Sequence, residues 1–230
     1  MTGPPAFYAR PGSAWGDLVT LLHLPYTVWH LSYVAIGAGL APDIDWTVLA
    51  GTLLAFFFGL GIGAHALDEV HDRPLRTGLR DATLWALGVG GLVVGGALGV
   101  VGAFIISPVL LVWVVVGLVL AAGYGLEWSA LLHSNWGFGV AWGAFPVLVG
   151  FWAQTEALSL AVILMAAATT VLSRAQRELS TPARRIRRTD DPIEVSGWSR
   201  EELLSTWETA LRLLSVAIPL LALGLLAGHL

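Results

Sequence analysis

Seven long apolar stretches constrain this chain more than any other feature of its sequence. Each is close to the ~20 residues that a helix needs to cross ~30 Å of hydrocarbon. They occupy 19–40, 46–67, 82–104, 106–126, 136–154, 156–173 and 209–229. Only 12% of the residues are charged, against about 25% in a typical soluble domain. The sequence therefore predicts an all-α, polytopic transmembrane helical bundle of about seven spans, folded as one domain over residues 1–230.

The basic residues are all arginines, and they gather on one side of the predicted spans. With seven spans, the N-terminus and the loops after the second, fourth and sixth spans share that side. The arginines there, or at the same end of the last span, are Arg10, Arg73, Arg76, Arg80, Arg174, Arg177, Arg184, Arg185, Arg187, Arg188, Arg200 and Arg212. The opposite side carries Asp43, Asp45 and Glu156. Because basic loops stay in the cytoplasm, the sequence predicts an integral protein of the cell membrane with a cytoplasmic N-terminus and an external C-terminus.

The one sizeable segment outside the predicted spans is 174–208, which is basic and is expected to be cytoplasmic. We interpret its arginine run, 184–188, as a contact to anionic lipid headgroups. Ser199 and Glu202 have the spacing of a capping box, which predicts the start of a helix that continues into the last span. We therefore expect membrane lipids, and no nucleic acid, as partners of this segment.

Two residue types are missing, and each absence excludes a class of protein. Without cysteine there is no disulfide framework and no thiolate metal site. Without lysine there is no retinal Schiff base, which a seven-helix bundle would otherwise suggest.

Four polar residues directly follow the second apolar stretch. They are His65, Asp68, Glu69 and Asp72. Their spacing of i, i+3, i+4 and i+7 places them on one face of a helix. Carboxylates at the end of a membrane helix are costly to bury unless they meet cations or water. Ion pairs with the next arginines would explain Glu69 and Asp72, whereas the deeper His65 and Asp68 indicate a functional site.

Asp68 and Asp72 lie one helical turn apart, which suits a magnesium ion. Mg²⁺ prefers carboxylate oxygens and keeps water and phosphate oxygens at its other positions. Glu69 is the third candidate ligand on this face. Arg73 and Arg76 follow directly, and guanidinium groups hold a diphosphate through paired hydrogen bonds. The stretch therefore predicts a Mg²⁺-dependent diphosphate site at the cytoplasmic face.

A second group of polar and aromatic side chains lies in the first predicted span. The spacing i, i+3, i+7 and i+10 places on one stripe His23, Tyr26, His30 and Tyr33. Trp29 lies in the same span, and Tyr124 ends the fourth. An aromatic pocket can hold an isoprenoid chain and stabilise an allylic cation through its ring faces. The alternative is that these rings are ordinary packing and interfacial residues.

Several segments together resemble the UbiA superfamily of intramembrane prenyltransferases. The stretch 24–38 is similar to that family's first helix, 68–72 to its first aspartate motif, and 72–78 to the Arg-Pro segment that follows the motif. Segments 123–135 and 145–148 resemble the middle of the family's sequence. The resemblance implies a helical bundle with a cytoplasmic active site that uses Mg²⁺ to transfer a prenyl group from an isoprenoid diphosphate.

The chain also departs from the family's pattern. Ala64 and His65 stand where the first motif of the family has Asn and Asp. The three acidic positions of the family's second aspartate motif fall on Ala166, Thr169 and Ser173. Arg174 matches a basic residue that can follow that motif. The family usually has nine spans, where this sequence predicts seven.

Three functions remain open. The first is a UbiA-like prenyltransferase. Its catalytic residues would be His65, Asp68 and Asp72, its Mg²⁺ ligands Asp68, Asp72 and Glu69, and its substrate-binding residues Tyr26, Trp29, His30, Arg73, Arg76, Tyr124 and Arg174. The second is a membrane metalloenzyme, a hydrolase or oxidase, that binds Zn or Fe through His65, Asp68 and Glu69 with His30 or His133. The third is a non-catalytic lipid-binding membrane protein.

Overall fold

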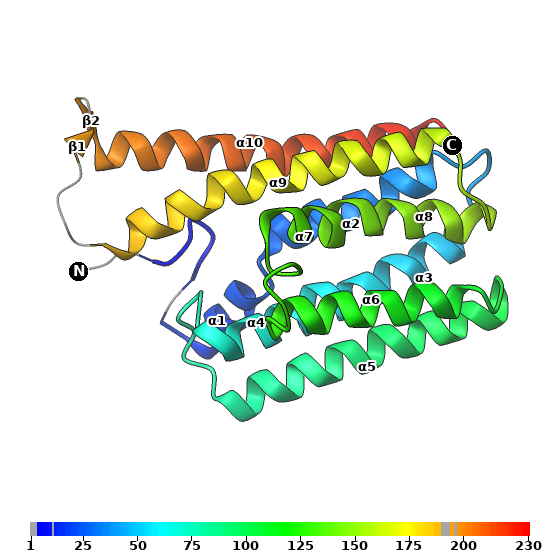
Figure 1. Cartoon of the computed structure of the whole chain (residues 1–230), viewed down its shortest axis with the longest axis horizontal. Coiled ribbons are helices and arrows are strands. Elements are labelled where there is room, and N and C mark those ends of the chain that lie inside the picture. Colours follow the sequence, from blue (N-terminus) through cyan, green and yellow to red (C-terminus); the bar gives the residue numbers. More distant parts are fainter. Residues whose placement is uncertain (1–3, 11, 190–193, 196) are drawn as a thin grey trace.

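The computed structural model describes residues 4–10, 12–189, 194–195 and 197–230, and within them the chain is almost entirely helical (Figure 1). The elements are α1 (Ala14–Leu21), α2 (Leu24–Gly39), α3 (Trp46–Phe56), the π-helix η1 (Phe57–Ala64), α4 (His65–Asp72), α5 (Asp81–Ile105), α6 (Leu110–Gly125), α7 (Asn135–Gly139), the π-helix η2 (Val140–Ala144), α8 (Phe145–Thr155), α9 (Leu160–Arg188), β1 (Glu194–Val195), β2 (Trp198–Ser199) and α10 (Arg200–Ala227). The two short strands pair as an antiparallel ribbon. The all-α fold class is confirmed apart from that ribbon.

Four helices of the described chain are long and apolar enough to cross a membrane. They are Trp46–Asp72, Asp81–Ile105, Asn135–Thr155 and Arg200–Ala227. The first joins α3, η1 and α4 without a break, and the third joins α7, η2 and α8. The other three predicted spans coincide with α2 and α6, of 16 residues each, and with the first part of the 29-residue α9. The chain thus has the helices of an integral membrane protein, while the count of seven spans and their orientation stay predictions.

The first predicted span, 19–40, is wrong as a single helix, because the chain is interrupted before its middle. α1 ends at Leu21, and His23 precedes α2 with a left-handed backbone at φ +46°. This conformation is unfavourable for a residue with a Cβ. Pro25 then lies in the first turn of α2, where its missing N–H does no harm. The interruption gives His23 a position that a continuous helix would not allow.

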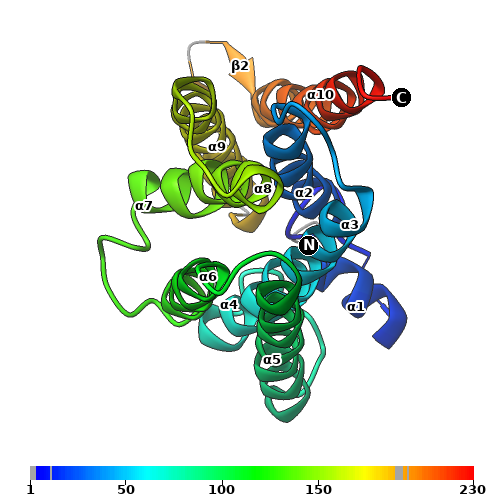
Figure 2. The ribbon, with the colours of Figure 1, turned by 90° about the vertical axis from the view of Figure 1, so that its right-hand side faces the viewer.

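Viewed end-on, the helices fall into two groups, with α2, α8, α9 and α10 lying above α3, α4, α5 and α6 (Figure 2). α2 packs against both α8 and α10. Its approach to α8 requires glycine, because a Cβ on Gly37 would lie 2.2 Å from the carbonyl oxygen of Val147. A Cβ on Gly150 would lie equally close to the carbonyl oxygen of Val34. Trp29 is fully buried in the core that these helices form.

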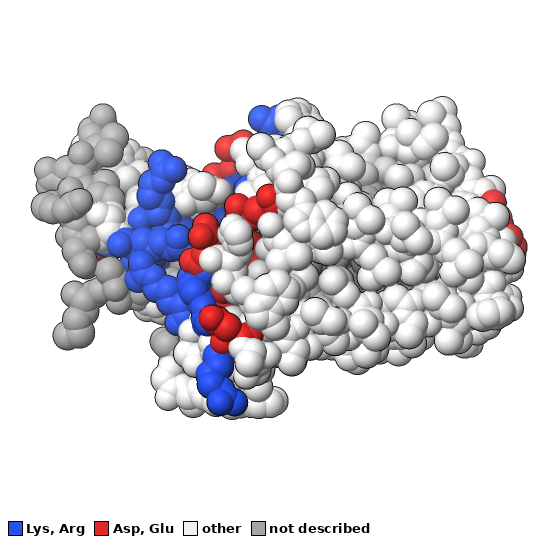
Figure 3. Space-filling model, turned by 60° about the horizontal axis from the view of Figure 1, so that its bottom comes forward, with Lys and Arg blue, Asp and Glu red and all other residues white. Residues whose placement is uncertain are grey.

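The charged side chains gather near one end of the molecule. Figure 3 shows the arginines as one band, next to a band of acidic residues, while most of the remaining visible surface is uncharged. This segregation agrees with the one-sided distribution of arginines along the sequence. The candidate site lies at this end, where Arg188 of α9 contacts the loop after α4.

Candidate functional site

Glu69 organises the loop that follows α4. Its side chain is fully buried, and one carboxylate oxygen accepts a hydrogen bond from the backbone N–H of Leu75 at 2.8 Å. The other oxygen accepts from the backbone N–H of Thr77 at 2.8 Å and from its hydroxyl at 2.9 Å. Both oxygens of this predicted metal ligand are therefore engaged by the loop.

Arg73, which the sequence assigned to diphosphate binding, also holds this loop. Its guanidinium donates to the carbonyl oxygens of Thr77 at 3.2 Å and Leu79 at 2.7 Å, and pairs with Asp81. Arg73 and Arg76 both have left-handed backbones, at φ +49° and +53°. Such strain persists only where the surroundings impose it, and it is concentrated at functional sites. Arg76 is exposed at the tip of the turn.

The two π-helical segments each hold one histidine, the partly buried His65 and the buried His30. The Nδ1 of His65 lies 3.2 Å from the carbonyl oxygen of Gly61 in η1. The Nδ1 of His30 lies 2.9 Å from the carbonyl oxygen of Trp142 in η2. Because a carbonyl oxygen only accepts, each Nδ1 carries the proton and each Nε2 of the neutral ring keeps a free lone pair. π-Helical segments are frequent at functional sites, and here they set the hydrogen-bonding roles of two predicted site residues.

His23 joins this group, although the sequence analysis did not include it among the site residues. Its side chain is buried, and its Nε2 has no hydrogen-bond partner within the described chain. Its ring lies against that of His65, with the centroids 4.1 Å apart, and against Tyr8 at 5.6 Å. The sequence signal that could have identified it is its place on the polar-aromatic stripe with Tyr26 and His30. In the part of the chain that the structure describes, no three His, Asp or Glu side chains are grouped to hold one metal ion.

Three arginines meet at the end of α4, and two of them come from α9. Arg188 donates a hydrogen bond of 2.6 Å to the carbonyl oxygen of Pro74, which ties α9 to the loop that carries Arg76. Burial, together with the positive charges of Arg184 and Arg76, lowers the pKa of the Arg188 guanidinium. Arg184 also interacts electrostatically with Asp68. No carboxylate of the described residues forms an ion pair with this arginine cluster, Arg76, Arg184 and Arg188.

Tyr124 is placed by contacts that the sequence did not predict. Its hydroxyl accepts a hydrogen bond of 2.5 Å from Arg177, whose other nitrogen donates to the carbonyl oxygen of His133 at 2.8 Å. The rings of Tyr124 and His133 stack with centroids 4.8 Å apart. Glu127 lies 3.3 Å from Nε2 of His133 and 3.8 Å from Nε2 of His71. Arg177 of α9, and not the predicted Arg174, therefore holds Tyr124 in place.

The other predicted substrate-binding residues do not all meet at this site. Trp29 is packed inside the core and donates its indole N–H to the hydroxyl of Tyr33 at 2.5 Å. Arg174 lies 4.2 Å from the ring centroid of Trp136 and 3.7 Å from a carboxylate oxygen of Glu178 on its own helix. Neither arrangement brings these two side chains to Asp68. The structure thus provides no role for Trp29 or Arg174 at the end of α4.

The positions that correspond to the second aspartate motif face the interior of the bundle. The hydroxyl of Thr169 donates to the carbonyl oxygen of Gly143 at 3.0 Å. Ser173 is fully buried, as is most of Ala166. One turn further along α9, Gln176 has a buried Oε1 with no partner in the described chain. This face of α9 is therefore neutral and polar where the family has carboxylates.

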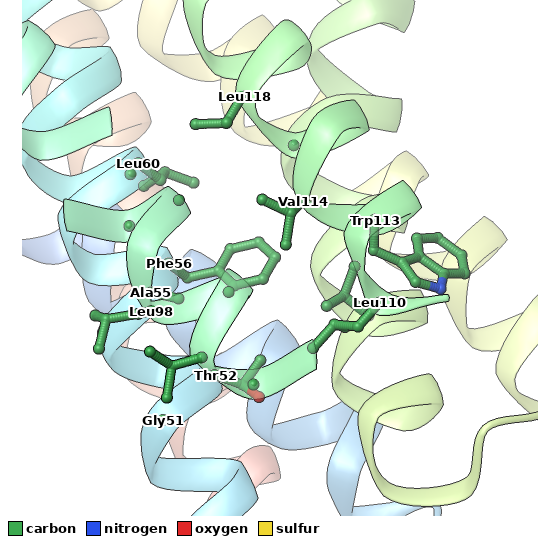
Figure 4. A pocket seen from close by; sticks show the side chains of 18 of the residues that line it. Gly51, Thr52, Ala55, Phe56, Leu60, Leu98, Leu110, Trp113, Val114 and Leu118 are labelled. Carbon is green, nitrogen blue, oxygen red and sulfur yellow. The ribbon is translucent and has the colours of Figure 1, made fainter. Parts of the chain in front are cut away.

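A separate apolar cavity of about 290 Å³ lies between α3, α5 and α6 (Figure 4). Side chains such as Phe56, Leu60 and Val114 line it, and Thr52 is one of its few polar neighbours. At Gly51, which lies in its wall, an added Cβ would meet nothing within 4 Å. The lining is almost wholly hydrocarbon, so the cavity suits an apolar chain and not the polar group expected at α4.

Comparison with known proteins finds no family model, no curated protein and no solved structure that matches this chain. The resemblance to the UbiA superfamily therefore stays a prediction that depends on the motifs quoted above.

Proposed function

We propose that this protein is a UbiA-like membrane prenyltransferase that binds an isoprenoid diphosphate, with Mg²⁺, at the end of α4. The observation that carries the proposal is the arginine cluster beside Asp68 and Asp72. The two acidic residues lie in α4, and the arginines lie in the loop after α4 and in α9. The fold therefore brings positive and negative side chains together from distant parts of the sequence. The same end of the bundle holds the aromatic ring of Tyr124.

The arginine cluster favours an anionic ligand on electrostatic grounds. Like charges a few ångströms apart near a protein surface repel by on the order of a few kcal/mol. Burial first, and then the positive charges of Arg184 and Arg76, lower the pKa of Arg188, while Glu69 and Asp72 act in the opposite direction. A diphosphate would reverse the sign of these interactions, and guanidinium groups bind its oxygens through charge-assisted, paired hydrogen bonds.

Asp68 and Asp72 are the residues that would hold Mg²⁺. Asp72 is exposed and Asp68 is partly exposed, so a metal ion that keeps several water molecules fits beside them. When bound, the ion would neutralise charge on the departing diphosphate. Glu69 would keep both carboxylates in place through the loop that it organises.

In the proposed reaction the bond between the first prenyl carbon and the diphosphate oxygen breaks, and its electron pair leaves with the diphosphate. A nucleophilic atom of the acceptor forms the new bond to that carbon and loses a proton. His65 is the group that we assign to this proton, because its Nε2 has a free lone pair. The phenol ring of Tyr124 would face the developing positive charge.

The apolar cavity of Figure 4 is the place that we assign to the hydrocarbon chain. Leu60 lines it and precedes Asp68 by eight residues on the same continuous helix. That separation corresponds to roughly 12 Å along a helix axis. An isoprenoid chain is long enough to cover such a distance from a diphosphate at Asp68.

The unpartnered Nε2 of His23 supports a second candidate, a membrane metalloenzyme that binds Zn or Fe through histidine and carboxylate ligands. Its ring lies directly against His65. The neutral face of α9 supports a third, a lipid-binding protein without catalytic activity, because Thr169 and Ser173 replace acidic residues there. The experiment below separates these candidates.

The test is binding of geranylgeranyl diphosphate to the purified protein, with and without Mg²⁺. Arg184→Gln and Arg188→Gln should each weaken binding about tenfold, the effect of losing one charge-assisted hydrogen-bonding group. Arg185→Gln is the matched control. It removes the same charge from an exposed residue of α9 that does not belong to the arginine cluster. Asp68→Asn should abolish the Mg²⁺ dependence, and metal analysis of the same protein should find no stoichiometric Zn or Fe.

Other outcomes point elsewhere. Stoichiometric Zn or Fe that is lost in His65→Ala would establish the metalloenzyme. Binding of the diphosphate that is indifferent to Mg²⁺, to Asp68→Asn and to both arginine variants would favour a lipid-binding protein. If no isoprenoid diphosphate binds in a Mg²⁺-dependent way, the prenyltransferase proposal fails.

A further inference from the structure

The N-terminal segment lies against the candidate site without being part of any helix or strand. We call residues 4–9 the N-terminal strap. It passes beneath the second half of α9 before the chain enters α1 (Figure 1). Pro5 and Ala6 are buried, whereas Pro4 is exposed. The strap has no helix or strand, yet part of it is buried against the charged end of the bundle.

Side chains of α9 and α10 hold the outer side of the strap. Arg187 donates to the carbonyl oxygen of Pro4 at 3.2 Å, and Glu208 fixes that guanidinium through two hydrogen bonds of 2.5 and 2.8 Å. Arg212 lies over the ring of Phe7, 4.5 Å from its centroid. These contacts act on the strap from the two longest helices of the bundle.

The inner side of the strap contacts the site through Tyr8. Its ring lies edge-on against Tyr26, with centroids 5.5 Å apart, and against His23 at 5.6 Å. Tyr8 also interacts electrostatically with Asp68 and Arg184. A small cavity remains beneath the strap, lined by Tyr8, Tyr26 and Arg184 among others. The strap therefore covers Tyr26, His23 and the small cavity at this end of the bundle.

Few backbone hydrogen bonds retain the strap. Within it, the N–H of Ala9 donates to the carbonyl oxygen of Ala6 at 3.1 Å. Just after it, the N–H of Arg10 donates to the hydroxyl of Thr20 at 2.8 Å. Segments with few backbone hydrogen bonds open locally at a lower free energy than the helices around them. Phe7 and Tyr8 pack against the core, but with so few backbone hydrogen bonds the strap is expected to open at a lower free energy than α2, α9 and α10.

We propose that the N-terminal strap is a gate over the buried part of the candidate site, and that it must lift for a polar ligand to reach His23 and the small cavity lined by Tyr8, Tyr26 and Arg184. The ring of Tyr8 closes the gate from within, and Phe7 and Pro4 fasten it to α10 and α9. The inference goes beyond the proposed reaction, because it concerns access to the buried groups beneath the strap and not to the exposed Asp72 and Arg76.

The experiment uses the absence of native cysteine. Ser180→Cys places a reporter thiol on α9 in the small cavity beneath the strap, where Ser180 is 6% exposed. Its rate of reaction with a water-soluble, charged thiol reagent reports opening of the strap. Removing both rings with Phe7→Ala and Tyr8→Ala should raise this rate by about tenfold or more, because it removes the side-chain contacts that hold the segment closed.

Two controls make the result specific. Tyr8→Phe keeps the ring and should leave the rate at its original value. Ser205→Cys, at an exposed position on α10, should react equally fast with and without the strap substitutions. A Ser180→Cys rate that the double substitution does not change would overturn the proposal.

Amide hydrogen exchange of the unmodified protein supplies a second measurement that needs no variant. The strap should exchange faster than α2 and α9 under conditions in which both helices stay protected. Protection of the strap equal to that of α2 would mean that it is a fixed part of the core, and the gate would not exist. Neither measurement involves a diphosphate, so the gate can stand or fall independently of the prenyltransferase proposal.

Discussion

The two ends of the bundle are built on different principles. Near α4, the left-handed residues His23, Arg73 and Arg76 lie beside a π-helix and a buried polar atom without a partner. At the opposite end, α2 and α8 approach so closely that Gly37 and Gly150 have no room for a Cβ. Strained backbone and unsatisfied polar groups lower stability, and they persist only where the rest of the fold imposes them. The packed end also has one left-handed residue, Glu156 at φ +51°, but the unpartnered polar atom of His23 lies at the α4 end.

The largest effect should come from Glu69, the residue that fixes the polar end. Glu69→Ala removes the acceptor of three hydrogen bonds and leaves the backbone N–H groups of Leu75 and Thr77 buried without partners. Each buried, unsatisfied group costs about 1–3 kcal/mol. We expect the free energy of unfolding to fall by about 3 kcal/mol or more, measured by thermal or denaturant unfolding in detergent.

Asp72→Ala is the matched control for this prediction. Asp72 is also a carboxylate on α4, but it is exposed, and surface substitutions usually change stability by less than about 0.5 kcal/mol. If Glu69→Ala were as mild as Asp72→Ala, the loop after α4 would not depend on Glu69. The carboxylate would then be free to serve as a metal ligand, as the sequence predicted.

A smaller effect is expected at the packed end. Gly150→Ala places a Cβ 2.2 Å from the carbonyl oxygen of Val34, so α2 and α8 must move apart. Inserting extra carbon atoms into a packed core typically costs about 1–3 kcal/mol. Gly51→Ala adds the same group to open space in the apolar cavity and should leave the unfolding temperature nearly unchanged. Equal effects of the two substitutions would contradict close packing between α2 and α8.

Much of the fold follows from the apolar pattern of the sequence, because apolar stretches of about 20 residues become helices in a membrane. The turn between α5 and α6 is placed correctly by the short polar break near Pro108. The interruption at His23 is not visible in hydropathy, since the residues on both sides are apolar. The π-helices are also hidden, because they depend on a local shift in backbone hydrogen bonding that the apolar pattern does not encode.

In the site, too, the features set by neighbouring residues follow from the sequence, whereas contacts between distant segments do not. The face that His65 and Asp68 share follows from helical spacing alone, and α4 confirms it. The contribution of Arg184 depends on α9 continuing as one helix to Arg188 and packing over the loop after α4. Sequence separation conceals that contact, so the arginine run was interpreted only as a contact to lipid headgroups. The hydrogen bonds of Glu69 are hidden for a related reason, since its partners lie in a loop whose path the sequence does not specify. Its assignment as a metal ligand stays a prediction.

The smallest expected effect concerns pH and the N-terminal strap. Burial raises the pKa of Tyr8 above its ordinary value, and the neighbouring Tyr26 raises it further. For a group whose folded-state pKa is raised, the stabilising contribution is complete below the unfolded value, about 10 for a tyrosine, and is lost as the pH rises through the folded value. The strap should therefore stay equally closed from about pH 7 to 9. The measurement is the ratio of the Ser180→Cys and Ser205→Cys modification rates, compared at each pH with the same ratio in Tyr8→Phe, which carries the same two thiols. A ratio that rises across this range, but stays flat in Tyr8→Phe, would show that Tyr8 ionises at ordinary pH and is not buried as the closed strap requires.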